Sequence, residues 1–179
     1  LFGGMSRLSE GSIVATHNKS YSLTAEVEVP KSGANGVIVA IGGVTGGWSF
    51  YAKNGKLKHC YNFFGIHEYF AEGKQPIPEG KHQVRMEFKY DGGGIAKGGT
   101  VSLYVDGKKD GEGRVDMTVP MVFGTETCDL GRDAGAPVSS DYEAKGNQFS
   151  GQVNWVQIEL EKDDHDHLIS PEERFTIAM

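Results

Sequence analysis

The feature of this sequence that most constrains its fold is a short-range alternation of apolar and polar residues. In residues 23–29, Leu, Ala and Val side chains alternate with Thr24, Glu26 and Glu28, and the pattern ends at Pro30. Residues 84–90 and 101–105 repeat the alternation. Because successive side chains of a β-strand point to opposite faces of a sheet, the pattern predicts strands with one buried face.

Turn signals separate these segments. Asn54-Gly55 and Asp106-Gly107 are typical of two-residue hairpins, since a type I′ turn needs positive φ at both central residues. Glycine supplies 26 of the 179 residues, without the regular spacing of collagen, as in a chain with many tight turns. The glycine-rich residues 92–99 join two predicted strands. We therefore interpret them as a plain hairpin loop, because a phosphate-binding loop would open a helix.

Two further patterns describe the sheet. Residues 36–42 are apolar at every position except glycine, which predicts a strand that is central or covered on both faces. Near the end of the chain, Val153 and Trp155 share one parity while Val156 and Ile158 share the other. Such a switch predicts a β-bulge near Trp155.

Together these patterns predict an all-β fold, an antiparallel β-sandwich of the jelly-roll, laminin-G or concanavalin A-like type. The sandwich is expected over residues 1–162. Residues 163–179 are expected to form an acidic connector and a short C-terminal helix that starts at Ser170-Pro171. The connector contains Asp and His residues at 163–167, which we interpret as a solvated linker.

Composition limits the classes of partner. The net charge of −6 argues against nucleic-acid binding, which needs a basic surface. No apolar run approaches the ~20 residues of a membrane-spanning helix, so no membrane partner is expected. The chain opens with Leu1 and has neither an initiator Met nor a signal peptide, so we expect a piece of a longer protein. Cys60 and Cys128 could form one disulfide or remain two unpaired core thiols.

An aromatic-rich segment is the first candidate binding region. Aromatic rings stack on the apolar faces of sugars, so exposed rings here could bind carbohydrate. The alternative is packing in the core or against a partner, and strand parity points Trp48 inward. The candidate residues are Trp48, Tyr51, Tyr61, Tyr69 and Phe70.

A second candidate region contains Asp129 and Asp133. Two carboxylates four residues apart, among glycines, could supply oxygen ligands to Ca²⁺ at the rim of a sandwich. The alternative is an ion pair between Arg132 and one of these carboxylates that fixes a long loop. No Gly-X-Ser-X-Gly elbow is present and no cysteine has an activating neighbourhood, so no catalytic residue is predicted.

Several stretches resemble the C-terminal portion of bacterial arylsulfatases of the formylglycine-dependent sulfatase family. They include Tyr-Asp-Gly-Gly-Gly at residues 90–94, Leu-Tyr-Val-Asp-Gly at 103–107 and Gly-Arg-Asp-Ala-Gly-Ala-Pro-Val at 131–138. The others are residues 3–5, 22–30, 46–57 and 167–174. The resemblance runs in order along nearly the whole chain.

The resemblance implies an accessory role. The parent enzyme would hydrolyse sulfate esters with formylglycine and Ca²⁺ held in an N-terminal catalytic domain, the expected partner of this chain. Cys60 and Cys128 lack the Pro and Arg of the formylglycine motif, so no catalytic residue or cofactor carries over. The leading hypothesis is a non-catalytic domain that packs on the catalytic domain and shapes substrate access. The alternative is a lectin-like module that binds carbohydrate.

Overall fold

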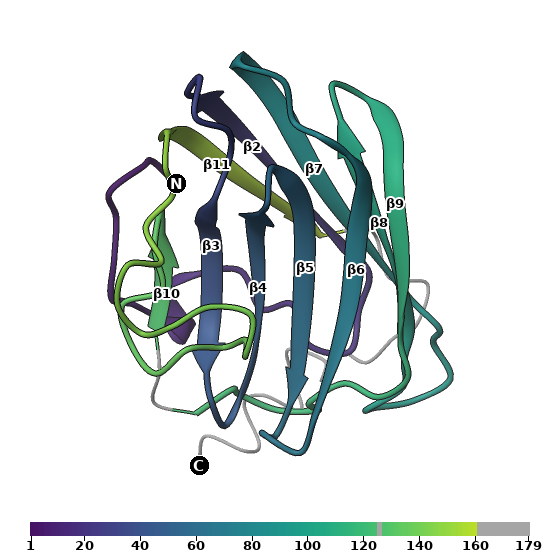
Figure 1. Ribbon diagram of the computed structural model, residues 1–179. Helices are drawn as coiled ribbons and strands as arrows, with labels where there is room; N and C mark the ends of the chain where they lie inside the picture. Colours follow the sequence, from purple (N-terminus) through teal and green to yellow (C-terminus); the bar gives the residue numbers. More distant parts are fainter. Residues whose placement is uncertain (125–126, 161–179) are drawn as a thin grey trace.

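The computed structural model describes residues 1–124 and 127–160 (Figure 1). The described residues contain eleven strands and one short 3₁₀-helix, Glu10–Ser12. No helix in this part of the chain is long and apolar enough to cross a membrane. The strands are β1 Leu8–Ser9, β2 Tyr21–Val29, β3 Gly36–Gly43, β4 Gly46–Lys53, β5 Lys56–Phe63, β6 His67–Pro76, β7 Gly80–Tyr90, β8 Gly99–Val105, β9 Lys108–Val115, β10 Thr127–Leu130 and β11 Gln152–Leu160.

All eleven strands belong to one antiparallel sheet that folds over on itself. Their order is β1-β10-β3-β4-β5-β6-β9-β8-β7-β2-β11. In Figure 1, β3 to β6 lie in front of β2, β7, β8 and β11, which gives two packed layers. The layers are connected where β6 pairs with β9 at only two positions, Glu72 with Glu112 and Gly73 with Gly111. The predicted antiparallel sandwich is therefore confirmed.

The main core lies between the two layers. The inward positions of β2, which alternate as the sequence predicts, are fully buried together with Trp48 and Phe50 of β4 and Leu57 of β5. Burial of such side chains stabilises each by about 1.5–3 kcal/mol, so this interface dominates the stability of the fold.

The predicted local features are also found. Asn54 and Gly55 have φ values of +53° and +82°, and they connect β4 to β5 in a tight hairpin. The pairing of β11 with β2 shifts register between Val153 and Trp155, which is the expected bulge. The glycine-rich residues 92–99 connect β7 to β8 without a helix. Cys60 and Cys128 are buried and unpaired, which decides between the two alternatives for these thiols.

One segment differs from expectation. No strand is predicted from the sequence over residues 63–78, yet they contain the ten-residue strand β6. Its inward side has one large residue, Tyr69, followed by the small Ala71 and Gly73, so no clear apolar alternation results. The predicted acidic connector and C-terminal helix lie outside the described residues.

A second, smaller core covers the outer face of the front layer. Residues 131–150 cross in front of β3 in Figure 1. From this segment, hereafter the covering loop, Val138 is buried against the sheet and Tyr142 packs beside it. The sheet side of this core consists of Val37, Ala40, Tyr51 and Cys60. The strand predicted to be covered on both faces, β3, is therefore covered by the main core and by this loop.

Candidate functional site

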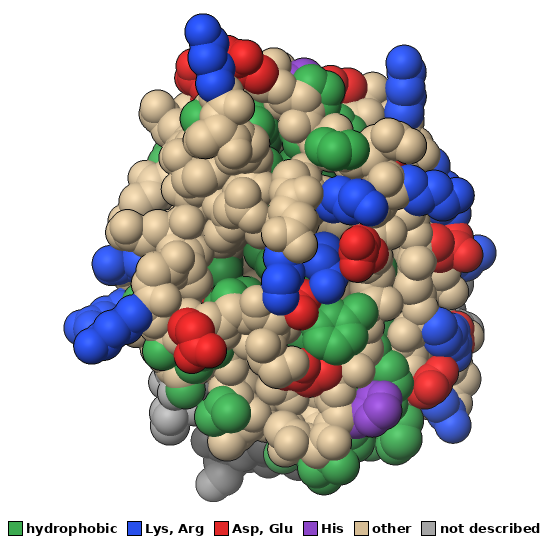
Figure 2. Space-filling model, in the orientation of Figure 1, with side chains coloured by type: hydrophobic (Ala, Val, Ile, Leu, Met, Phe, Trp, Pro, Cys, Tyr) green, Lys and Arg blue, Asp and Glu red, His purple; other side chains and the backbone are tan. Residues whose placement is uncertain are grey.

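The outer face of the front layer brings charged and aromatic side chains together beside the covering loop. Strand register aligns Tyr51 of β4 with Lys58 of β5, and Lys58 with Glu72 of β6. Figure 2 shows basic and acidic side chains interleaved with hydrophobic ones near the centre of this face. We call this group the outer-face site; its members are Lys53, Lys58, Glu68, Phe70, Glu72 and Asp141.

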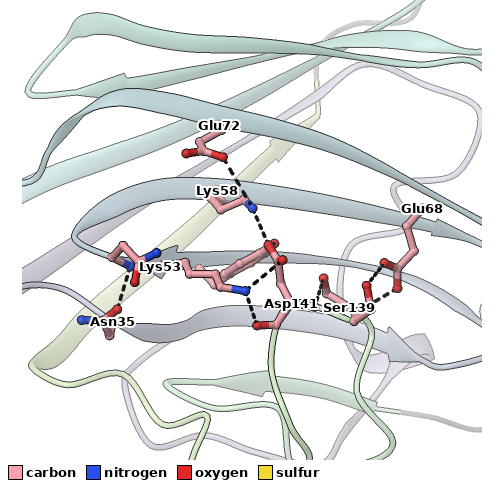
Figure 3. A network of polar contacts seen from close by, with 10 residues as sticks. Asn35, Lys53, Lys58, Glu68, Glu72, Ser139 and Asp141 are labelled. Atoms are coloured by element: carbon pink, nitrogen blue, oxygen red, sulfur yellow. Dashed lines mark hydrogen bonds and ion pairs between the residues drawn. The ribbon is translucent and has the colours of Figure 1, made fainter.

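Asp141, from the covering loop, is the centre of the polar network (Figure 3). Its carboxylate accepts a hydrogen bond from the hydroxyl of Tyr51 at 2.5 Å and from the ammonium of Lys53 at 3.0 Å. The ammonium of Lys58 lies 2.5 Å from the same carboxylate. Burial by itself would raise the pKa of Asp141, but the hydrogen bonds from Lys58, Tyr51 and Lys53 outweigh it and lower the pKa to about 2. Asp141 is therefore ionised at neutral pH.

Phe70 supplies the exposed aromatic surface of the site. Its side chain is 39% exposed, and the ammonium of Lys58 lies 5.2 Å from the ring centroid. This distance is within the range of a cation–π contact. Glu68 and Glu72, two residues before and after Phe70 on β6, extend from the same face of the strand because side chains alternate. Phe70 therefore lies between two carboxylates.

The two glutamates are held by different partners. Glu68 accepts hydrogen bonds from the backbone N–H of Ser140 at 2.9 Å and from its hydroxyl at 2.5 Å. Glu72 lies 3.6 Å from the ammonium of Lys58. Contacts from β4, β5, β6 and the covering loop thus hold these polar side chains in place.

Asp133 fixes the covering loop from within. Its carboxylate accepts a hydrogen bond from the N–H of Val138 at 2.9 Å, and the hydroxyl of Tyr142 lies 2.8 Å from the same oxygen. The hydroxyl of Tyr142 also lies 2.8 Å from that of Ser49 on β4. Burial raises the pKa of Asp133. The buried carboxylate therefore holds the loop together from within, and Tyr142 ties the loop to the sheet.

The predicted calcium ligands are both buried, and their oxygens face donors of this chain. Asp129 accepts hydrogen bonds from the N–H groups of Arg7 at 2.7 Å and Ala134 at 3.2 Å. Within residues 1–124 and 127–160, no group of three or more His, Cys, Asp or Glu side chains is arranged to hold a metal ion. Calcium binding by Asp129 and Asp133 stays a prediction. Arg132, the predicted ion-pair partner, donates instead to the hydroxyl of Ser6 at 3.0 Å.

The five predicted aromatic residues separate into two groups. Trp48, Tyr51 and Tyr61 are buried, so their rings cannot stack on a sugar at the surface. Trp48 and Tyr61 belong to the main core, whereas Tyr51 lies under the covering loop. Tyr69 is half-buried beside His67, with ring centroids 4.5 Å apart. Of the five, Phe70 has the largest exposed fraction.

The charged members of the site are not predicted by the sequence analysis. Lys58 and Glu72 alternate outward beside Phe70, so strand parity could have indicated them once β6 was recognised. Asp141 lies in an irregular loop 83 residues after Lys58, and no local pattern connects the two.

Two surface pockets lie elsewhere and involve the first residues of the chain. One, of about 470 Å³, is formed by Leu1 and Phe2 against Trp155 and its neighbours on β11. The other, of about 570 Å³, is lined by Gly3, Gly4, residues 130–132 and residues 148–149 and 151–153. Neither combines an exposed aromatic ring with fixed charged side chains, which is why the outer-face site is the stronger candidate.

Comparisons with known proteins identify the fold. No family model and no curated protein matches the chain. Domains LG4-5 of the mouse laminin alpha1 chain match with a TM-score of 0.53 and 16% identity over 89% of this chain and 42% of that one. The CBM40 of the Ruminococcus gnavus IT-sialidase, bound to α2,3-sialyllactose, matches with a TM-score of 0.54 and 13% identity over 83% and 80% of the two chains.

A third match agrees. The LG1-3 region of the laminin alpha2 chain gives a TM-score of 0.52 and 12% identity over 80% of this chain and 27% of that one. At these identities the likeness defines a laminin-G-like, concanavalin-like β-sandwich and nothing finer. No finding links the chain to sulfatases, so the arylsulfatase resemblance stays an expectation from the sequence.

Proposed function

We propose that this chain is a lectin-like carbohydrate-binding module and that its ligand lies on the outer-face site. The observation that carries the proposal is the exposed ring of Phe70 among polar side chains whose positions are already fixed. The CBM40 structure, bound to sialyllactose, supports it as an example of a similar fold that holds a sugar.

The arrangement matches what sugar binding requires. A pyranose offers an apolar face, which stacks on an aromatic ring, and a rim of hydroxyl groups, which exchange hydrogen bonds with charged and polar side chains. Lys53 is 40% exposed at its side chain and keeps donor capacity, whereas Glu68 and Glu72 can accept from hydroxyls. Because the network holds these groups in place, little side-chain entropy is lost on binding.

The test is titration of the chain against a glycan panel, with Phe70→Ala as the diagnostic variant. We expect saturable binding that Phe70→Ala weakens at least about fivefold, since an aromatic contact contributes about 0.5–1.5 kcal/mol beyond the area it buries. Phe64→Ala is the matched control, because Phe64 is also exposed but lies in the turn after β5, outside the site. A flat response across the panel would reject the proposal.

A second candidate function is favoured by a different part of the surface. Exposed apolar side chains gather at the end of the sandwich where β3 turns into β4 and β5 turns into β6, and some are visible along the lower edge of Figure 2. The carbonyl of Val44 accepts a hydrogen bond from Asn62 at 3.3 Å, which brings the two turns together. We call this surface the apolar end; it consists of Val44, Phe64 and Ile66 with Met121 and Val122, which lie between Val119 beside Gly46 and Gly124 beside Thr45.

Such a surface suits the accessory role that the arylsulfatase resemblance implies. An apolar patch of neighbouring side chains is typical of a contact with another protein or domain. If the chain packs on a catalytic domain through the apolar end, Ile66→Asp together with Val122→Asp should lower aryl-sulfate turnover or thermal stability of the longer protein. Unchanged turnover and unchanged thermal stability would remove this candidate. The same pair on the isolated chain serves as the control for folding.

A further inference from the structure

We propose that the outer-face site recognises a neutral, hydroxyl-rich sugar and discriminates against sialylated or sulfated ones. The inference rests on the proposed function and adds to it the chemical class of the ligand. It follows from the charges around Phe70 and from the way in which they are already paired.

The negative charges of the site outnumber the positive ones. The site contains three carboxylates, Glu68, Glu72 and Asp141, and two ammonium groups, Lys53 and Lys58. The site therefore carries a formal charge of −1, within a chain whose net charge is −6. An incoming carboxylate or sulfate would therefore meet repulsion from the carboxylates of the site.

Neither ammonium is free to neutralise an anionic ligand. Lys58 is only 13% exposed at its side chain, and its ammonium lies 2.5 Å from Asp141 and 3.6 Å from Glu72. Lys53 donates to both the carboxylate and the backbone carbonyl of Asp141, at 3.0 and 2.8 Å. An acidic sugar would have to compete with Asp141 and Glu72 for these ammonium groups, which already have carboxylate partners. Asp141 keeps its negative charge at neutral pH, because its pKa is lowered to about 2.

The remaining hydrogen-bonding capacity suits hydroxyl groups. The carboxylates of Glu68 and Glu72 accept hydrogen bonds and cannot donate them when ionised. They lie on the two sides of Phe70 along β6, where the hydroxyl rim of a sugar stacked on the ring would be. Sugar hydroxyls donate to such acceptors, whereas a sulfate or carboxylate has no proton to offer. The site therefore matches a neutral pyranose.

The experiment compares neutral glycans with their sialylated and sulfated derivatives, one matched set at a time. Lactose and sialyllactose form one such set, and each Kd is measured at pH 7 in low salt and again in about 150 mM salt. We expect each neutral glycan that binds to bind at least about fivefold more tightly than its acidic derivatives, which is the effect of one like charge about 4 Å away in water. Salt should reduce the difference, since it screens exposed charges.

Charge-neutral variants identify the source of the discrimination. Glu68→Gln with Glu72→Gln preserves size and removes two negative charges, and it should reduce the discrimination at least threefold. Glu28→Gln with Glu79→Gln is the matched control: both residues are exposed outside the outer-face site, Glu28 on β2 and Glu79 in the turn before β7, so net charge changes by the same two units without altering the site. Equal discrimination in both variants would assign the effect to net charge and overturn the inference.

The remaining outcomes separate the two proposals. Tighter binding of the acidic member of a set, with loss of binding in Phe70→Ala, would overturn this inference and leave the carbohydrate-binding proposal intact. Absence of binding to every member of the panel would reject the carbohydrate-binding proposal and this inference with it.

Discussion

His59 is the single residue with the clearest consequence for pH dependence. It lies fully buried on β5, its ring is stacked at 6.2 Å from that of Trp48, and neither ring nitrogen has a hydrogen-bond partner within the described residues. Burial lowers its pKa from 6.5 to about 3. The imidazole is therefore neutral in the folded protein at every pH above about 3.

This shift makes the fold sensitive to acid. Between pH 6.5 and 3 the unfolded chain protonates His59 whereas the folded chain does not, so stability is complete above pH 6.5 and falls as the pH is lowered. The expected loss is about 1.4 kcal/mol per pH unit. His59→Phe should remove about 2 kcal/mol of the loss between pH 6.5 and 4.5, measured by urea unfolding at both values. If both His59→Phe and His59→Leu keep the pH dependence of the wild-type protein, the assignment to His59 is contradicted.

At the scale of elements, the junction between β6 and β9 is tightly constrained. A Cβ at Gly111 would lie 2.2 Å from the carbonyl oxygen of Glu72 and 3.0 Å from the Cα of Gly73. Both obstacles are backbone, so a side chain cannot be accommodated by a change of rotamer. Gly111 therefore allows the two layers of the sandwich to join.

Gly111→Ala should therefore destabilise the protein by more than about 2 kcal/mol, because the backbone of one strand would have to move. The measurement is the free energy of unfolding in urea. Gly11→Ala is the matched control, since a Cβ at Gly11 meets nothing within 4 Å, and its effect should stay within about 1 kcal/mol of zero. Comparable losses in the two variants would show that the junction is not tightly constrained.

The surroundings of each strand explain why β2 and β7 can be predicted from the sequence and β6 cannot. Strands that face the main core, such as β2 and β7, show alternation because every second side chain is apolar. In β6 the inward side is short of large apolar residues, since Gly73 must meet β9 closely, so the alternation is lost. Local turns such as Asn54-Gly55 can be predicted from the sequence because two residues alone determine them.

At the scale of the whole molecule, the candidate site depends on contacts that no local pattern encodes. Phe70 could be suspected as an exposed ring, but Lys58 and Asp141 meet only because the covering loop folds back over β4 and β5. The burial of Tyr51 has the same cause: its parity points outward, and a loop some 90 residues later covers it. Long-range packing therefore decides both which aromatic residues are available and which charges surround them.

The covering loop and the main core should also open separately, and the two buried thiols report on them. Cys60 lies under the loop and Cys128 in the main core, and burial raises the pKa of each to about 12, so neither reacts until its surroundings open.

Asp141→Ala removes the loop's contacts with Lys53, Lys58 and Tyr51. Because local opening is governed by local contacts, this variant should label at Cys60 at least tenfold faster, equivalent to about 1.4 kcal/mol, with Cys128 changed less than threefold. Labelling is measured in single-thiol proteins made with Cys128→Ala or Cys60→Ala, each with and without Asp141→Ala. An equal acceleration at both thiols would mean that the loop and the core unfold as one unit.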